Sequence, residues 1–158
     1  MELEKIVEEV RRGKELEDIL KEFDWKFFEK FVKEIFEVNN FLVKQNFIFK
    51  TKRKYEIDLI ASRNNLVLCA DCKSWASKGS KKSKLKKAVE KQEERVRELK
   101  KFLRKNPIAK NELKISQKSK FKSIIITLLE EDFVKERESL IIPIFKLNSF
   151  LNEVERFI

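Results

Sequence analysis

The stretch that decides the fold is Tyr55–Trp75, with the sequence YEIDLIASRNNLVLCADCKSW. Two runs rich in Ile, Leu and Val, residues 55–61 and 66–73, flank the dipeptide Asn64-Asn65. This pattern predicts two β-strands joined by a tight turn. Asparagine tolerates the left-handed backbone that a two-residue hairpin turn requires.

The register of this hairpin brings acidic residues together. If Asn64-Asn65 is the turn, Asp58 lies directly opposite Asp71, and Glu56 lies opposite Lys73. Directly opposed residues of an antiparallel pair share a face, and opposed like charges are destabilising. Two facing aspartates therefore require a cation, and Lys73 follows Asp71 on the same face. The hairpin predicts a divalent-metal site.

Composition and charge favour one folded domain with a polyanionic partner. The chain has 158 residues, is 42% hydrophobic and contains 14 Phe, which is enough for a real core. Its net charge of +10 is uneven, because residues 44–122 hold 25 Lys/Arg against 8 Asp/Glu. A basic middle indicates a nucleic-acid-facing surface. A solvated lysine-rich surface, of the kind found in thermophiles, is the alternative.

Several functional classes are disfavoured. The chain has no apolar run long enough to span a membrane and an acidic amphipathic N-terminus, so we expect a cytoplasmic protein. Cys69 and Cys72 form a lone CxxC without any His, which a zinc site would need as further ligands. Their three-residue offset sends them to opposite faces of a strand. We interpret both as apolar cysteines, and the absence of His excludes His-based triads.

The first helices place a carboxylate on an apolar stripe. Residues 3–12 and 16–23 predict two short amphipathic helices, and residues 25–38 predict a longer one. Trp25, Phe28 and Val32 belong to the apolar stripe of the third helix, and Glu29 lies on it as well. A core-facing carboxylate costs free energy unless a nearby group requires its charge. Alternatively, Glu29 is a stripe-edge residue that pairs with Lys33.

The rest of the chain predicts alternating strands and helices. We expect a strand over 41–49, a basic loop over 74–83, a helix over 84–105, a basic loop over 110–122, strands over 122–128 and 140–145, and a closing helix over 149–158. Pro143 places the last strand at an edge of the sheet. Gln92 lies on the inward stripe of the long helix, and Arg95 follows one turn later. A hydrogen-bonded core Gln and a solvated Arg are the alternative interpretation.

Asp58, twelve intervening residues, then Asp71-x-Lys73 resembles the motif of the PD-(D/E)xK nuclease superfamily. The stretch WKFFEKFVKEIF…EIDLIA…LCADCKSW…KQEERVREL is most similar to archaeal restriction-endonuclease-like proteins. Holliday-junction resolvases and modification-dependent restriction enzymes are more distant relatives. The resemblance implies an αβββαβ core with a mixed central sheet. Short N-terminal helices (residues 1–23) and a C-terminal strand and helix would complete one domain, with residues 24–158 as the nuclease-like core.

The resemblance also implies roles for individual residues. Asp58, Asp71 and the backbone carbonyl of Cys72 would bind Mg²⁺ or Mn²⁺. Glu29 would help to hold the metal or its water, and Lys73 would orient the attacking water. Gln92 matches a helix position near the active site in many members. The candidates for nucleic-acid contacts are Lys78, Lys81, Lys82, Lys84 and Arg95.

The sequence departs from the superfamily pattern at three positions. Ile57 replaces the proline that often precedes the first aspartate, and Asp71 replaces the commoner glutamate. Ser74 follows Lys73, where the most similar members have His. None of these changes removes a required group.

The sequence thus favours a Mg²⁺-dependent DNA endonuclease, and the resemblance implies that it acts as a homodimer. Mg²⁺ suits this chemistry because it binds through a few carboxylates plus waters and activates water for hydrolysis. A second hypothesis is an inactive or partner-dependent nucleic-acid-binding module on a nuclease fold. A third is a basic α/β protein in which the aspartates do not meet.

Overall fold

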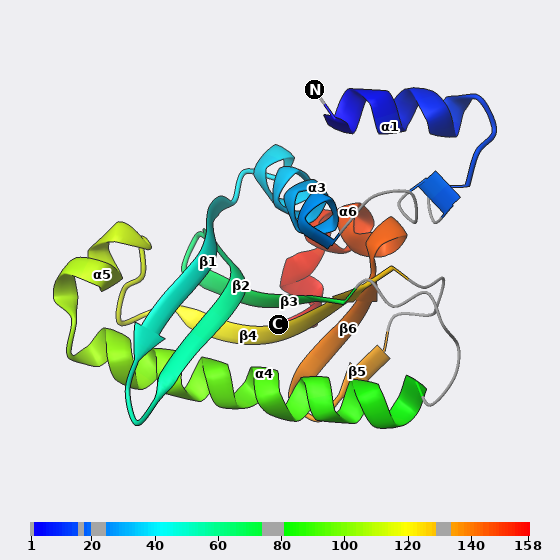
Figure 1. The fold of residues 1–158 in the computed structure, drawn as a ribbon. Coiled ribbons are helices and arrows are strands. Elements are labelled where there is room, and N and C mark those ends of the chain that lie inside the picture. The colour runs from blue at the N-terminus through cyan, green and yellow to red at the C-terminus, as the bar shows by residue number, and fades with distance from the viewer. Residues whose placement is uncertain (1, 16–17, 20–24, 74–80, 129–133) are drawn as a thin grey trace.

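The computed structural model describes residues 2–15, 18–19, 25–73, 81–128 and 134–158. Six strands form one mixed sheet in the order β1-β2-β3-β4-β6-β5 (Figure 1). They are β1 Leu42–Lys50, β2 Lys54–Arg63, β3 Leu66–Lys73, β4 Lys120–Thr127, β5 Val134–Glu136 and β6 Ser139–Pro143. Strand β2 runs antiparallel to its neighbours β1 and β3, strands β3, β4 and β6 are parallel, and β5 runs antiparallel to β6.

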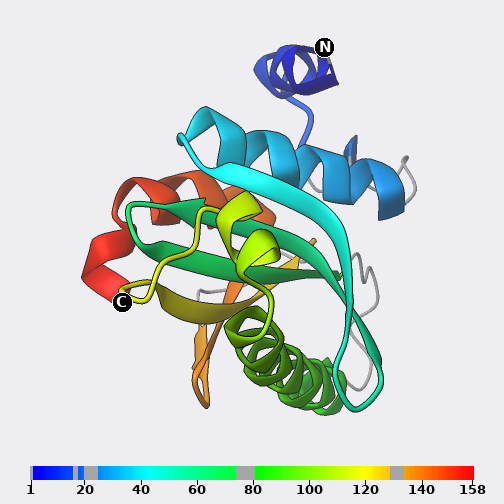
Figure 2. The same cartoon turned by 90° about the vertical axis from the view of Figure 1, so that its left-hand side faces the viewer.

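Helices cover both faces of the sheet. Helices α3 and α6 pack on one face and α4 packs on the other (Figures 1 and 2). The helices are α1 Glu2–Arg11, α3 Trp25–Val38, α4 Lys81–Arg104, α5 Pro107–Glu112 and α6 Ile144–Asn152, followed by a 3₁₀ turn over Val154–Phe157. This mixed α/β architecture confirms the predicted restriction-endonuclease-like fold. Because the whole of β3 and β4 is sandwiched, their apolar residues form near-continuous runs.

The β2–β3 hairpin has the predicted turn. Asn64 and Asn65 both adopt the left-handed conformation, with φ of 49° and 65°. Arg63 pairs with Leu66 as expected, and pairing continues as far as Leu59 opposite Ala70. The ladder ends there, one pair before Asp58 and Asp71. The predicted direct pairing of these aspartates, and of Glu56 with Lys73, is therefore not part of the ladder.

The β1–β2 hairpin is irregular at the position of Asp58. Asn46 has a φ of 53°, and the pairing of β1 with β2 skips Asn46 and Asp58. Side chains of β2 change faces there, because Ile57 packs on the α4 side and Leu59 on the α3 side. In a regular strand, residues two apart share a face. Asp58 thus lies where β2 is detached from both of its neighbours.

Several predicted boundaries on the α4 side were wrong. Helix α4 begins at Lys81, so residues 81–83 are helical, and residues 74–80 of the predicted loop lie outside the described part of the chain. The predicted loop over 110–122 contains the end of α5 and the start of β4. Pro107 starts α5 because the first helical position does not require a backbone N–H donor.

The prediction that Pro143 marks an edge strand was also wrong. Strand β6 lies between β4 and β5, and Pro143 is its last residue, opposite Thr127 of β4. Within the described residues, the pairing of β5 with β6 runs from Ser139 to Ile141. The chain becomes helical at Ile144, which makes residues 144–145 part of α6 instead of the predicted strand. The predicted closing helix over 149–158 is likewise divided between α6 and the 3₁₀ turn.

The N-terminal region is only partly described. Helix α1 confirms the first short helix, and its Ile6 is buried in the core on the α3 side. Most of the predicted second helix, residues 16–23, lies outside the described residues. Of the helices in the described ranges, none has the length and apolar character needed to cross a membrane.

Candidate active site

The site is built around Asp58, at the break in the β2 ladder. Its Oδ2 accepts a hydrogen bond of 3.0 Å from the backbone N–H of Cys72. This bond ties β2 to β3 just beyond the last ladder pair, Leu59 with Ala70. The side chain therefore lies between the two faces of the sheet. From this position it meets acidic residues from both faces.

Glu29 reaches Asp58 from helix α3. It is only 2% exposed, among the apolar side chains that bury the same helix face. Burial and, to a smaller extent, the nearby Asp58 and Glu56 carboxylates raise the pKa of Glu29 to about 8. A hydrogen bond to Asp58 accompanies this rise, so the Glu29 carboxyl retains its proton near neutral pH. Trp25, predicted on the same stripe, is instead 54% exposed.

Asp71 reaches the site from β3 on the α4 side. Burial raises its pKa to about 6 against the opposing effect of Lys73, and Asp58 adds to the rise. Lys73 Nζ lies 3.2 Å from Asp71 Oδ2, and Arg95 Nη1 lies 3.9 Å from the same atom. That oxygen is buried and accepts no hydrogen bond from the residues that the structure describes. Its charge is met by the ion pairs with Lys73 and Arg95, and no hydrogen bond from the described residues adds to them.

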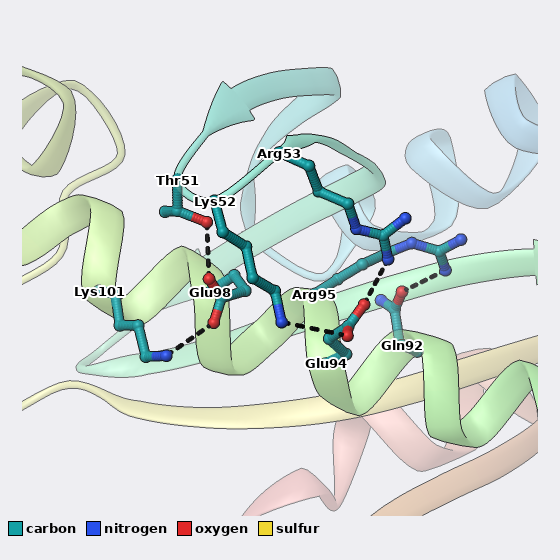
Figure 3. A network of polar contacts seen from close by, with 8 residues as sticks. All are labelled: Thr51, Lys52, Arg53, Gln92, Glu94, Arg95, Glu98 and Lys101. Carbon is teal, nitrogen blue, oxygen red and sulfur yellow. Dashed lines mark hydrogen bonds and ion pairs between the residues drawn. The ribbon is translucent and has the colours of Figure 1, made fainter.

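Gln92 and Arg95 extend the site along α4, and Figure 3 shows them side by side. Gln92 is fully buried and donates a hydrogen bond of 2.9 Å from Nε2 to the carbonyl of Cys69. Arg95 Nη1 donates to Gln92 Oε1 over 3.0 Å. Gln92 thus links Arg95 to β3, which is the strand that carries Asp71.

The remaining sequence-predicted residues are less closely connected. Lys84 is exposed near the start of α4, and Lys81 and Lys82 belong to the first turn of this helix. Lys78 and Ser74 lie outside the described residues. Cys69 and Cys72 are free thiols that face opposite sides of the sheet, as predicted.

The acidic groups suit a metal that is held by few protein ligands. Within the described ranges, no group of three or more Asp, Glu, Cys or His side chains forms a complete metal cage. The oxygens of Asp58 and Asp71 nevertheless converge, and Asp71 Oδ2 lacks a donor. Mg²⁺ commonly binds to one or two carboxylates and keeps several waters, so two aspartates fit it.

Sequence reasoning missed two parts of this arrangement. Glu56 is exposed, yet its negative charge helps to raise the pKa of Glu29. The hydrophobic periodicity of the sequence does not indicate this interaction. The tip of the β1–β2 hairpin is attached to α4, where Lys52 and Arg53 contact Glu94 and Thr51 donates a 2.6 Å hydrogen bond to Glu98 (Figure 3). These partners are more than 40 residues apart in the sequence. The only feature of the sequence that could have indicated these contacts was the basic composition of the hairpin tip.

The mixed α/β fold is that of a restriction-endonuclease-like domain. The nuclease-related domain (NERD) family matches residues 19–142, which is most of the chain. The chain therefore belongs to the nuclease-related domain family. It is also 26% identical over 135 residues to an uncharacterized protein of Archaeoglobus fulgidus, an alignment that covers 85% of this chain and 94% of that protein.

Proposed function

We propose that this protein is a PD-(D/E)xK-type endonuclease that hydrolyses DNA phosphodiester bonds with Mg²⁺ or Mn²⁺. The observation that carries this proposal is the convergence of Glu29, Asp58 and Asp71 beside Lys73. Buried acids that raise each other's pKa are unfavourable for stability, and such groups concentrate at functional sites. Membership of the nuclease-related domain family supports the same activity.

Asp58 and Asp71 would hold the metal ion, together with the backbone carbonyl of Cys72. Glu29 would bind one of the metal's waters. When bound, the metal supplies a Lewis acid for the phosphate oxygens and lowers the pKa of the attacking water. Such a cation would also offset the mutual repulsion of the two aspartates, together with Lys73 and Arg95.

The side chains of the chain itself would position the substrate. Lys73 lies beside Asp71, where its ammonium group can orient the water and stabilise charge on the phosphate. Arg95 is one-quarter exposed and is held by Gln92, so its guanidinium can reach a phosphate oxygen from a fixed position. The Glu29 carboxyl can hold a proton at Asp58 until pH approaches 8.

A second function is supported by one observation. The described residues contain no complete three-ligand metal cage, as an inactive or partner-dependent DNA-binding module would show. Metal titration separates the two functions. Binding of Mg²⁺ or Mn²⁺ by the wild type, and its loss in Asp58→Ala, supports the enzyme. An absence of metal binding supports the binding module.

Cleavage assays test the proposed activity directly. Purified protein is incubated with Mg²⁺ or Mn²⁺ and a panel of linear, supercoiled, branched and modified DNAs. We expect cleavage that disappears in Asp58→Ala and in Lys73→Ala while thermal unfolding stays cooperative. Equal cleavage by Asp58→Ala would refute the assigned site. Sedimentation of the protein with and without DNA tests the proposed homodimer.

A further inference from the structure

The tip of the β1–β2 hairpin carries cations that the fold does not neutralise. Lys50 and Lys54 are the last paired residues of the two strands and lie directly opposite each other. Both are exposed, and neither forms an ion pair within the described part of the chain. Opposed like charges destabilise a strand pair. An anion between or above these lysines would relieve that repulsion.

The neighbouring cations of the tip have a different environment. Lys52 and Arg53 contact Glu94 of α4 (Figure 3). Arg53 also lies over the ring of Tyr55, 4.6 Å from its centroid. The inner face of the hairpin is fixed by stacked rings, with Phe49 and Tyr55 centroids 5.6 Å apart. The tip is therefore a rigid ribbon. Its inner cations are paired with α4 and its outer lysines face solvent.

The hairpin tip is close to the candidate site along the chain. Lys54 precedes Asp58 by four residues on β2, which is at most about 13 Å of extended strand. Glu94, which holds the inner cations, precedes Arg95 of the site on α4. Along the axis of B-DNA, about 13 Å corresponds to roughly four phosphates of one strand.

We propose that the outer lysines of this tip, Lys50 and Lys54, form a DNA-contact site that binds backbone phosphates about four nucleotides from the scissile bond. This inference rests on the proposed nuclease function, because it takes the carboxylate site as the point of cleavage. The contact would fix the register of the DNA without reading its sequence. Because Lys54 and Asp58 lie on the same strand, the contact would also fix the position of the DNA relative to Asp58.

A second basic surface provides the matched control. A groove of about 710 Å³ is lined by Lys100 and Arg104 of α4 and by Lys120 of β4, among others. Lys120 pairs with Leu66, which is five residues, or about 17 Å, from Asp71 along β3. Ile158 also lines this groove, and Figure 2 shows the C-terminus and the β1–β2 hairpin on opposite sides of the molecule. The groove has the same charge chemistry but faces away from the hairpin.

The test measures DNA binding without cleavage. The full chain, the double variant Lys50→Ala/Lys54→Ala and the groove variant Lys100→Ala/Arg104→Ala are titrated onto a fluorescent DNA duplex in EDTA at several salt concentrations. Each lost phosphate contact should reduce the slope of log K against log salt by about 0.9. We expect the hairpin variant to lose a slope of about 1.8 and to bind roughly tenfold or more weakly at 0.1 M salt.

Three results would overturn the proposal. They are an unchanged slope in the hairpin variant, a loss of slope confined to the groove variant, and a wild type that does not bind DNA. Thermal unfolding shows whether each variant is folded, and Lys50→Arg/Lys54→Arg should bind as the wild type does. A wild type that binds DNA through these lysines but never cleaves it would refute the nuclease function alone.

Discussion

Two sets of carboxylates in this domain have opposite surroundings. Glu94 and Glu98 on α4 accept contacts from the hairpin tip, and those donors lower the pKa of both groups. Glu29 and Asp71 lie against another carboxylate in a buried position, and burial raises their pKa values above the ordinary range. Glu98 and Asp71 are nevertheless buried to a similar extent, at 4% exposure each.

The comparison shows that burial alone does not indicate function. Each carboxylate of the α4 set has a donor that only a folded hairpin supplies, so these contacts hold β1 and β2 in place. The acidic cluster has too few donors for its oxygens, and Asp71 Oδ2 has none among the described residues. Such an arrangement lowers stability, and a bound cation would add to the positive charge that Lys73 and Arg95 supply.

The largest expected effect comes from removing a charge of the acidic cluster. Asp71→Asn should reduce Mg²⁺-dependent DNA cleavage by roughly 1,000-fold, because the metal loses a ligand worth several kcal/mol in the transition state. It should also abolish stabilisation by the metal, which reaches about 2.7 kcal/mol at 100 times the dissociation constant. Cleavage assays and thermal melts with and without Mg²⁺ measure both effects.

The matched variant for this prediction is Glu98→Gln, which changes a similarly buried carboxylate of the α4 set. Its metal-dependent rise in Tm should equal that of the wild type. If Glu98→Gln lost the metal effect and Asp71→Asn retained it, the distinction between the two sets would be wrong.

The second effect is a dependence of stability on pH. The pKa of Glu29 is about 8 in the folded chain and near 4.5 in the unfolded one. The folded state therefore binds the proton more tightly, so the contribution of Glu29 to stability is fully present below pH 4.5 and is lost as pH rises through 8. Without metal, the wild type should lose about 2 kcal/mol between pH 6 and pH 8.

Glu29→Gln removes this titration and should flatten the pH profile over the same window. The titration of Asp71 affects stability mainly at lower pH, because its pKa is about 6. Glu37→Gln, an exposed change on the same helix, should retain the wild-type slope. Thermal melts from pH 5.5 to pH 8.5 measure the pH dependence of stability in each protein. Parallel profiles for wild type and Glu29→Gln would show that Glu29 does not hold the proton.

Local sequence was sufficient to predict the parts of the site that depend on period and turn type. Asn64-Asn65 defined the β2–β3 register as far as Leu59, and the offset of Asp71 and Lys73 placed both on one face. Glu29 and Gln92 were recognisable because each interrupts an apolar stripe at helical spacing, and both are buried. These inferences required only contacts within an element or across one turn.

The other features depend on contacts between distant segments. The change of faces at Asp58 requires Asn46 of another strand to be left-handed, and neither residue's neighbours indicate it. Pro143 is the last residue of β6, which the sheet order places between β4 and β5. Glu98 resembles a surface residue of a charged helix until Thr51 is placed beside it. Tertiary packing decided each of these cases.

The smallest expected effect concerns the exposed end of the α4 set. Glu94→Gln removes the partner of Lys52 and Arg53, which are each more than 60% exposed in their side chains. Exposed ion pairs contribute little, so Tm should fall by no more than a few degrees. Glu98→Gln should lower Tm further, because the Glu98 carboxylate that accepts the hydrogen bond from Thr51 is buried.

The same two variants separate anchoring of the hairpin from its charge. Glu94→Gln leaves two additional cations on the tip, so DNA binding in EDTA should become slightly tighter and more salt-dependent. A weakened anchor should simultaneously slow cleavage, because Asp58 lies on the strand that the tip holds. Tighter binding with slower cleavage would show that α4 positions the hairpin for the site. Equal changes in binding and cleavage would show that Glu94 affects only the charge of the tip.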